Sequence, residues 1–252
     1  MNILVIGAGG VGASMASIAE TRSFFTTFVL ADITKSRAEE AIALLDDKSK
    51  FVAEQVDARD MTAIKTLIER VKADVVVNAC DPRMNEPIFN AAYEAHCNYI
   101  DMAMNLSEPH ASNPYEEVGS PLGADQLAAD QAWRDRGLLA LVGMGVEPGL
   151  SDVFARYAAD NLFDTIDEIG VRDGSNLSID GLDFAPTFSI WTTIEECLNP
   201  PIVWEKNRGL YTTDCFSEPE VFHFPAGIGP YECVNVEHEE VLLIPREIDC
   251  NR

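Results

Sequence analysis

The sequence predicts an α/β fold in which a parallel sheet covered by helices on both faces is followed by a second part of mixed α/β structure. Through residue 142, short apolar runs alternate with stretches of helical periodicity. Several of these runs are apolar on both faces, as strands buried in a parallel sheet are. Beyond Gly149, short strand-like runs predominate. We therefore expect two domains, residues 1–148 and 149–252.

The expected elements of the first domain alternate between strand and helix. The strands are expected at residues 2–6, 28–32, 51–56, 74–79, 99–102 and 138–142. The helices are expected at residues 12–21, 36–45, 61–71, 85–96 and 124–136. A segment rich in Pro, Ser and Gly, residues 109–123, is expected to form a loop.

The second domain differs from the first in its expected secondary structure and in its charge. Its strands are expected at residues 168–172, 187–190, 202–205, 221–224 and 241–244, and its helices at residues 151–161 and 192–198. The first 148 residues carry 12 basic and 22 acidic side chains, a net charge of −10, whereas the remaining 104 carry 6 and 20, a net charge of −14. This change supports a domain boundary near Pro148.

Composition narrows the possible functions of this 252-residue chain. Its 42 acidic and 18 basic residues give a net charge of −24, which repels phosphate backbones and argues against a nucleic-acid partner. No apolar run approaches the ~20 residues of a membrane span, and no basic segment precedes the first one. The six cysteines form no CxxC pair, so we interpret them as reduced thiols. Together these features predict a cytoplasmic protein without a membrane partner.

A glycine-rich loop, Gly7-Ala8-Gly9-Gly10-Val11-Gly12, follows the first expected strand and opens the first expected helix. In this context GxGxxG is typical of a loop that binds a dinucleotide pyrophosphate. Gly7 permits the tight turn, Gly9 removes a Cβ that would meet the pyrophosphate, and Gly12 lets the helix approach the sheet. With Gly10 and Val11, these residues are predicted to bind a cofactor in a doubly wound sheet of the Rossmann type. The alternative is a glycine-rich turn without a ligand.

Asp32 ends the second expected strand, 20 residues beyond Gly12. A carboxylate there can bind the adenosine ribose hydroxyls and repel a 2′-phosphate, so NAD is favoured over NADP. Lys35 and Arg37 lie just downstream and offer the opposite interpretation, in which they face a phosphate, so NADP stays possible. No Tyr has Lys four positions later, which argues against a short-chain dehydrogenase.

Further stretches carry a resemblance to a known family. They are Val56-Asp57-Ala58, Val76-Val77-Asn78-Ala79, Tyr99-Ile100-Asp101-Met102-Ala103 and the run from Gly143 to Asp152, GMGVEPGLSD. With the glycine loop, they make the chain resemble the saccharopine dehydrogenase-like family, which includes saccharopine reductases, carboxynorspermidine dehydrogenases and lysine-6-dehydrogenase-like enzymes. Members of the family usually continue past the point where this sequence stops, so we expect a C-terminally incomplete copy.

The resemblance implies a Rossmann domain combined with a mixed α/β substrate and dimerisation domain, and hence a homodimer. It implies hydride transfer between a nicotinamide and the C–N bond of an amino-acid-like or opine-like substrate. Carried over by residue, Asp57 and Ala58 would lie beside the adenine, and Asn78 and Ala79 beside the ribose and nicotinamide. Asp101 would lie where cofactor and substrate meet. For Asn78 and Asp101 the alternative is ordinary turn formation at a strand end.

Three charged residues are candidates for the substrate. Asp101, the candidate catalytic residue, would hold a substrate ammonium or position the cofactor ribose. Arg83 suits a substrate carboxylate because its planar guanidinium can bind one bidentately, and Asp81 lies in the same expected turn. The alternative for Arg83 is an ordinary surface arginine. The competing function is dinucleotide binding without catalysis, in a regulatory relative or an inactive fragment.

No metal site is expected, because no spacing unites the four histidines. His96 ends an expected helix, where its charge would complement the helix dipole. Glu237, Glu239 and Glu240 flank His238, and we interpret them as a solvated acidic strand end.

Overall fold

The computed structural model describes residues 1–174, 178–182 and 189–252. The chain forms two compact units, each described separately below. Unit 1 comprises Met1–Asn105 and Gly123–Gly145, and unit 2 comprises Leu106–Leu122 and Val146–Arg252. The limits expected from the sequence, 1–148 and 149–252, lie three residues later and do not separate residues 106–122. As limits of functional domains they stay a prediction.

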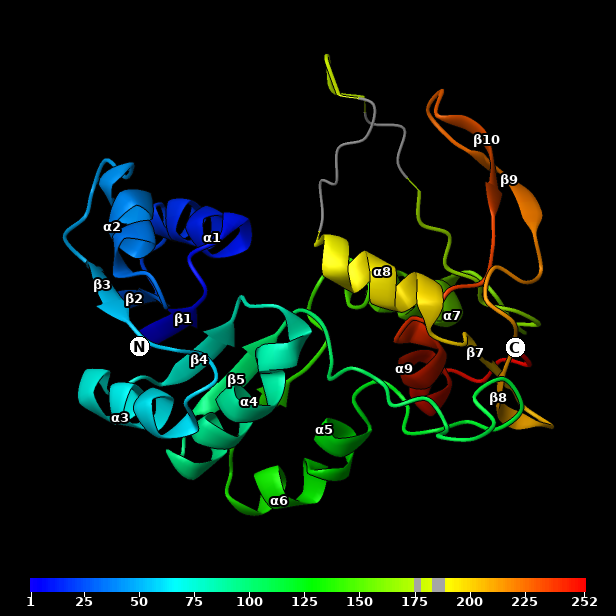
Figure 1. Cartoon of the computed structure of the whole chain (residues 1–252), viewed down its shortest axis with the longest axis horizontal. Helices are drawn as coiled ribbons and strands as arrows, with labels where there is room; N and C mark the ends of the chain where they lie inside the picture. Colours follow the sequence, from blue (N-terminus) through cyan, green and yellow to red (C-terminus); the bar gives the residue numbers. More distant parts are fainter. Residues whose placement is uncertain (175–177, 183–188) are drawn as a thin grey trace. The chain divides into compact units, whose positions relative to one another are not determined.

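Unit 1 contains a six-stranded sheet in the order β3-β2-β1-β4-β5-β6, with every neighbouring pair parallel (Figure 1). Its strands are β1 Asn2–Ile6, β2 Thr27–Asp32, β3 Phe51–Gln55, β4 Val75–Asn78, β5 Asn98–Asp101 and β6 Ala140–Leu141. This strand order is that of the doubly wound Rossmann sheet. The predicted fold class is therefore confirmed.

Helices follow the strands of unit 1 as the periodicity predicts. They are α1 Gly10–Glu20, α2 Lys35–Ala43, α3 Met61–Val71, the 3₁₀ turn η1 Pro82–Met84, α4 Asn85–Glu94, α5 Ala124–Ala128 and α6 Asp130–Asp135. The helix expected at 61–71 is confirmed residue for residue, because Asp60 caps it by accepting a hydrogen bond from the Ala63 N–H at 2.9 Å. The helix expected at 124–136 is instead two short helices that meet at Ala129.

The core of unit 1 lies on both faces of the sheet. Leu4 and Ile6 of β1 pack on one face and Ile3 and Val5 on the other, since successive side chains of a strand point to opposite sides. Helices α3 and α4 contribute to the first cluster, and α1 and α2 to the second. Two covered faces explain why these strands are apolar throughout.

Unit 2 combines three helices with two antiparallel hairpins in its described part (Figure 1). The helices are α7 Leu150–Asn161, α8 Ile190–Leu198 and α9 Glu240–Glu247. The hairpins join β7 Ile202–Glu205 to β8 Gly209–Thr212 and β9 Glu220–Phe224 to β10 Gly229–Cys233. The predicted mixed α/β character of the second part is therefore confirmed.

Two strands expected in unit 2 are wrong. Residues 241–244 belong to α9, whose buried residues Glu240 and Ile244 lie four positions apart on one helical face. A run of four apolar residues does not distinguish a strand from a helix by itself, and here packing decides. Residues 168–172 form no strand, although Asp167 and Ile169 exchange backbone hydrogen bonds with Arg252. The strand expected at 187–190 lies partly outside the described residues, and Ile190 begins α8.

Within the described ranges, no helix is both long and apolar enough to cross a bilayer.

Candidate functional site

Because every neighbouring pair is parallel, the carboxyl ends of all six strands of unit 1 lie along one edge of the sheet. In open sheets of this kind ligands bind outside these ends, at the point where the strand order reverses. Here the reversal falls between β1 and β4, the two central strands, which pair with each other. The predicted cofactor residues follow these strands, so the fold brings them to a common edge.

The glycine loop follows β1 and is shaped by contacts that exclude larger side chains. Gly7 has a φ of +109°, and a Cβ there would lie 2.6 Å from the carbonyl oxygen of Ala79. A Cβ on Gly12 would overlap the carbonyl oxygen of Gly7. Both glycines are therefore required by the fold itself, as the sequence predicted for a tight turn and a close helix.

Gly9 and Gly10 differ from these two glycines. A Cβ at either position would meet no atom within 4 Å, so the fold does not require glycine there. Gly9 is the N-cap of α1, and no side chain caps this helix end. The first N–H groups of a helix lack partners within the helix and favour an anion. Open space in front of an uncapped helix N-terminus is what a dinucleotide pyrophosphate requires, so these residues fit the cofactor.

Asp32 ends β2 with its carboxylate turned into the protein. The residue is 7% exposed. Its Oδ2 accepts a hydrogen bond from the Ala8 N–H, and its Oδ1 accepts one from the Thr34 N–H, both at 2.9 Å. The predicted contact of Asp32 with a ribose stays a prediction, whereas its contact with the glycine loop is part of the protein.

Asn78 ends β4 and belongs to a buried hydrogen-bond network. Its amide group donates to Asn85 Oδ1 at 2.6 Å and to the Tyr99 hydroxyl at 3.2 Å, and its oxygen accepts from the Cys80 N–H at 3.0 Å. The next residue, Ala79, presents the carbonyl that approaches Gly7. Asn78 therefore fixes the turn after β4, and the predicted contacts of Asn78 and Ala79 with a cofactor stay predictions.

Asp101, the residue predicted to act at the substrate, ends β5 and is 1% exposed. Its carboxylate accepts hydrogen bonds from the Gly143 N–H and from the Gln126 side chain, both at 2.7 Å. Gln126 in turn accepts a hydrogen bond from the Asn105 N–H at 2.7 Å. The carboxylate thus joins the end of β5 to the segment after β6, and its predicted catalytic role stays untested.

The remaining predicted residues form two ion pairs at strand ends. After β3, the Arg59 guanidinium donates to both carboxylate oxygens of Asp57 and lowers its pKa to about 2. After β4, Arg83 Nε donates to Asp81 Oδ1 at 2.7 Å, and this hydrogen bond lowers the pKa of Asp81. Arg83 thus already binds a carboxylate of its own turn. The predicted contacts of Asp57 and the adjoining Ala58 with adenine, and of Asp81 and Arg83 with a substrate, stay predictions.

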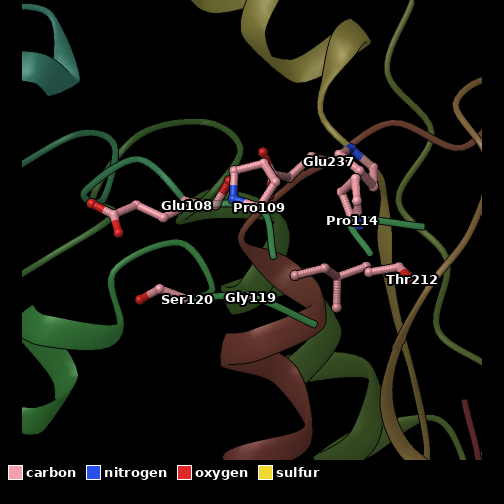
Figure 2. Close-up of a pocket in the computed structure, with 10 residues that line it drawn as sticks. Glu108, Pro109, Pro114, Gly119, Ser120, Thr212 and Glu237 are labelled. Atoms are coloured by element: carbon pink, nitrogen blue, oxygen red, sulfur yellow. The ribbon is translucent and has the colours of Figure 1, made fainter. Parts of the chain in front are cut away.

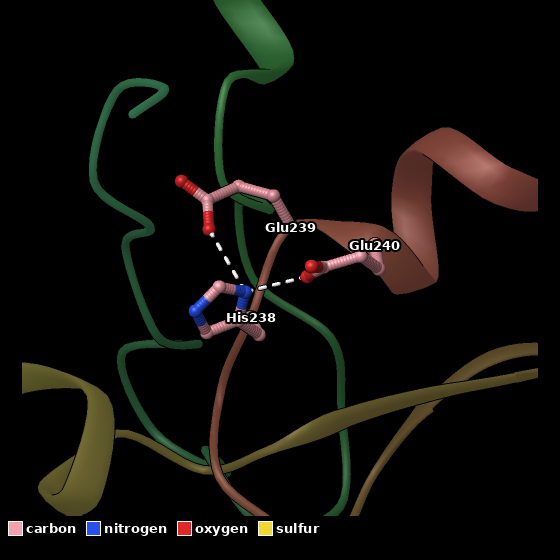
Figure 3. Close-up of side chains that lie close together, drawn as sticks. All are labelled: His238, Glu239 and Glu240. Atoms are coloured by element: carbon pink, nitrogen blue, oxygen red, sulfur yellow. Dashed lines mark hydrogen bonds and ion pairs between the residues drawn. The ribbon is translucent and has the colours of Figure 1, made fainter. Parts of the chain in front are cut away.

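A group that sequence reasoning misjudged lies in unit 2. The expectation of a solvated acidic strand end at Glu237, Glu239 and Glu240 is wrong, because the three residues are only 3%, 6% and 4% exposed. His238 Nδ1 lies 2.5 Å from Glu240 Oε2 and 3.4 Å from Glu239 Oε2 (Figure 3). Ser151 donates to Glu240 Oε1 at 2.7 Å. The positions of acidic residues in the sequence do not reveal whether their side chains are buried. Here the burial comes from packing at the start of α9.

Burial and neighbouring charges shift the pKa values of His238 and of two carboxyl groups that interact with it, Glu147 and Glu196. Burial opposes the imidazolium form of His238, but the hydrogen bond and charge of Glu240, with the charges of Glu239 and Glu196, raise its pKa to about 9. Burial first, and then the charges of neighbouring carboxylates, raises the pKa of Glu196 and of Glu147 to about 7. His238, Glu239, Glu240, Glu147 and Glu196 form the unit 2 cluster. This cluster can therefore exchange protons near neutral pH.

His238, Glu239 and Glu240 also have the residue types of a metal site. Their ligand atoms lie within 4.8 Å of one another, and no other group of this kind is present in the described ranges. The Nδ1 atom that would bind a metal is hydrogen-bonded to Glu240. In this arrangement the protonated His238 side chain forms ion pairs with both carboxylates and offsets one of their two negative charges.

Unit 2 also contains a pocket (Figure 2). Its volume is about 10 Å³, and Glu108, Thr212 and Glu237 contribute to its lining. A volume of ~10–15 Å³ accommodates about one water molecule, so this pocket is too small for an amino acid or a nucleotide.

The parallel sheet, the glycine loop and the uncapped α1 N-terminus define unit 1 as a dinucleotide-binding domain of the Rossmann type. Residues 3–141 match the family described as saccharopine dehydrogenase NADP binding domain. The chain belongs to this family, and the predicted resemblance is confirmed. The description of the family supports a nicotinamide cofactor.

Two relatives extend the comparison beyond the first domain. Carboxynorspermidine synthase of Vibrio cholerae is 31% identical over 260 residues, which cover all of this chain and 61% of the relative. Carboxyaminopropylagmatine dehydrogenase of Synechocystis is 29% identical over 194 residues, which cover 77% of this chain and 46% of the relative. The chain thus spans about three fifths of the length of the first relative.

A solved structure supports the fold over nearly the whole chain. Saccharopine dehydrogenase (L-Glu forming) from Saccharomyces cerevisiae superposes with a TM-score of 0.62 and 14% sequence identity. The match covers 94% of this chain and 50% of the yeast protein. At this identity the likeness concerns the fold alone.

Proposed function

We propose that this chain is an NADP-dependent oxidoreductase of the saccharopine dehydrogenase type. The reaction is hydride transfer between the nicotinamide and the C–N bond of a small amino-acid-like or opine-like substrate. The observation that carries the proposal is the open space over Gly9 and Gly10 at the uncapped N-terminus of α1. A nicotinamide cofactor supplies or accepts the hydride when it is bound.

The residues of the chain have separate roles in this proposal. The N–H groups at the start of α1, from Gly10 to Gly12, bind the pyrophosphate. Asp57 and Ala58 lie beside the adenine, and Asn78 and Ala79 beside the ribose and nicotinamide. Asp81 and Arg83 are proposed to bind the substrate, because ammonium and carboxylate groups require charged partners at the strand ends. Asp101, which is 1% exposed, is proposed to orient the site at the end of β5.

The preference for NADP is proposed against the preference for NAD that Asp32 suggested in the sequence. The family description names NADP, which supports a 2′-phosphate. Arg37 is exposed in the first turn of α2, and Lys35 is exposed with only a loose pair to Glu39 at 3.8 Å. Thr34, the N-cap of α2, makes no side-chain capping hydrogen bond. These features offer positive charge and N–H donors to a phosphate.

The substrate class is proposed from the relatives. Both relatives are named for a carboxylated amine, carboxynorspermidine in one and carboxyaminopropylagmatine in the other. A small amine with amino-acid character fits a family whose description refers to saccharopine dehydrogenase. A homodimer and a cytoplasmic location are further proposals, which sedimentation and fractionation would test.

The test has two stages. Titration of the chain with NADPH and NADH, followed by nicotinamide fluorescence, measures binding of each nucleotide. Absorbance of the reduced nicotinamide then measures turnover in both directions, with the oxidised cofactor and a panel of amino acids and amines, and with the reduced cofactor, the same amines and carbonyl compounds. We expect binding of NADPH in preference to NADH and turnover with an amine or its carbonyl precursors. A folded chain that binds neither nucleotide would refute the proposal.

Dinucleotide binding without turnover is the second candidate. The observation that favours it is the coverage of 61% of the first relative, because residues required for turnover can lie in the remaining part. Binding of NADPH without turnover across the panel, together with turnover by a full-length relative under the same conditions, would select this candidate.

A further inference from the structure

We propose that Asp32 is a positioning residue that holds the glycine loop in its binding conformation, and that it does not select between NAD and NADP. This inference rests on the proposed function, since it concerns the same dinucleotide site. It assigns to the acidic residue at the end of β2 a role different from the ribose contact usual for an acid at this position.

Two consecutive residues of β2 attach the loop to the strand. The Gly7 N–H donates to the Ala31 carbonyl at 2.8 Å, and the Ala8 N–H donates to Asp32 Oδ2 at 2.9 Å. The second bond is buried and links residues 24 positions apart. The turn is thereby fixed to β2 directly before the helix N-terminus where the pyrophosphate would bind.

The opposite side of the loop is fixed by β4. The Ala79 N–H donates to the Ile6 carbonyl at 2.8 Å, and the Ala79 carbonyl oxygen lies 2.6 Å from the position that a Cβ on Gly7 would take. Between the attachments to β2 and to β4, the Ala8 N–H donates to a side chain, the carboxylate of Asp32. Without the carboxylate, this buried N–H would lose its acceptor, and the turn would lose its attachment on the β2 side.

The carboxylate presents little surface to a nucleotide. Its second oxygen accepts the Thr34 N–H at 2.9 Å, and the residue is 7% exposed. Both oxygens therefore serve backbone donors, and hydrogen bonds to a charged acceptor are among the strong ones. Selection at the adenosine ribose then falls to the exposed residues that follow, Lys35 and Arg37.

The experiment compares the affinities of the wild-type chain and Asp32→Ala for NADPH and for NADH. Because the substitution removes the acceptor from both N–H groups, we expect both affinities to fall by a similar factor, about tenfold or more. The ratio of the two dissociation constants should stay within about twofold of the wild-type ratio. A loss confined to NADH, or a gain in affinity for NADPH, would overturn the inference and restore the ribose contact.

A matched control separates positioning from general destabilisation. Asp60→Ala removes a carboxylate that caps α3 in the same unit and does not contact the loop. It should lower stability while leaving both affinities unchanged. If Asp60→Ala weakens nucleotide binding as much as Asp32→Ala does, the effect of Asp32 is not specific to the loop and the inference is wrong.

A measurement on the wild-type chain does not depend on any variant. Amide hydrogen exchange, observed by NMR without nucleotide, should show the Ala8 N–H protected, because its acceptor belongs to the protein. Exchange at the rate of an unprotected amide would contradict the inference. If the wild-type chain is folded with a protected Ala8 amide but binds neither nucleotide, the proposed function fails and the positioning contact stands.

Discussion

The buried carboxylates of unit 1 and unit 2 are stabilised in different ways. In unit 1, Asp32 accepts two backbone N–H groups, and Asp101 accepts one backbone N–H and one side-chain amide. In unit 2, Glu239 and Glu240 both face His238, and the pKa of nearby Glu196 is raised to about 7 by burial first. Hydrogen bonds from neutral donors to a carboxylate do not change with pH in the neutral range. An ion pair between a carboxylate and histidine does change, because it requires the protonated imidazole.

The difference indicates what each region can do. The carboxylates of unit 1 connect strand ends to loops and so define the shape of a dinucleotide site. The cluster of unit 2 holds protons whose release falls within the neutral and mildly alkaline range. Substitutions in unit 1 should therefore act on geometry and affinity, and substitutions in the cluster should act on pH dependence.

The largest effect is expected from Gly9→Val in the loop that Asp32 holds. The new side chain would enter space that is open in the protein, so the fold should be retained while NADPH binding is lost. Fluorescence titration and circular dichroism measure the two properties. Ser17→Val, at an exposed position of α1, is the control and should bind normally. Unchanged NADPH affinity in folded Gly9→Val would remove the loop from the cofactor site.

Asp101→Asn tests the same type of carboxylate at the end of β5. The amide would direct an N–H toward a group that donates to the carboxylate, so the free energy of unfolding should fall by about 1.5–3 kcal/mol. Denaturant unfolding measures this loss. If Asp101 also acts at the substrate, turnover should fall while NADPH affinity is retained. Wild-type turnover in this variant would leave Asp101 with the structural role alone.

The pH dependence of stability tests the unit 2 side of the comparison. His238 holds its proton to about pH 9 in the folded chain, against about 6.5 as its ordinary value, so the folded state binds more protons between these values. Stability from this residue is therefore complete below pH 6.5 and is lost as the pH rises toward 9, by on the order of 3 kcal/mol. The raised pKa values of Glu147 and Glu196 act in the same direction, but between their ordinary value of 4.5 and about 7.

Hydrogen exchange of peptides from α9 and α3, corrected for intrinsic rates, compares the two units between pH 6.5 and 9. We expect α9 to lose protection and α3 to change less. His238→Gln should flatten the dependence in α9. Protection of α9 that is constant or increases across this range in the wild-type chain would contradict the assigned ion pair.

A smaller effect is expected from Arg37→Ala, which tests where nucleotide selection lies. If selection belongs to the first turn of α2, affinity for NADPH should fall by about tenfold, the value of one charge-assisted hydrogen bond, while affinity for NADH is unchanged. Arg22→Ala, a basic residue in a different loop, should leave both affinities unchanged. Equal losses for the two nucleotides in Arg37→Ala would exclude a contact with the 2′-phosphate.

The smallest effect is expected from Arg59→Ala at the exposed pair with Asp57. Exposed ion pairs contribute little to stability because water and salt screen them, so thermal unfolding should show no measurable change. The pKa of Asp57, held at about 2 mainly by the hydrogen bond from Arg59, should rise toward its ordinary value. Carboxyl titration by NMR measures this shift. A large loss of stability would mean that exposed pairs in unit 1 contribute as the buried carboxylates do.

The sequence by itself determined the sheet, the glycine loop and the position of Asp32, Asn78 and Asp101 at strand ends. Local patterns are sufficient for these features, because apolar runs, helical periodicity and glycine spacing each reflect the local geometry of the backbone. The strand expected at 241–244, by contrast, is a helix, since a short apolar run fits either structure until its neighbours are present.

Only the tertiary structure decided the partner of each charged group. Asp32 meets Ala8 across 24 residues, and Asp101 meets Gly143 across 42, because the strand order places β2 beside β1 and β6 beside β5. Burial of Glu237, Glu239 and Glu240 likewise depends on packing that no spacing encodes. The physical reason is that hydrogen-bond distance and access to water are properties of the assembled chain, whereas the sequence records only order along it.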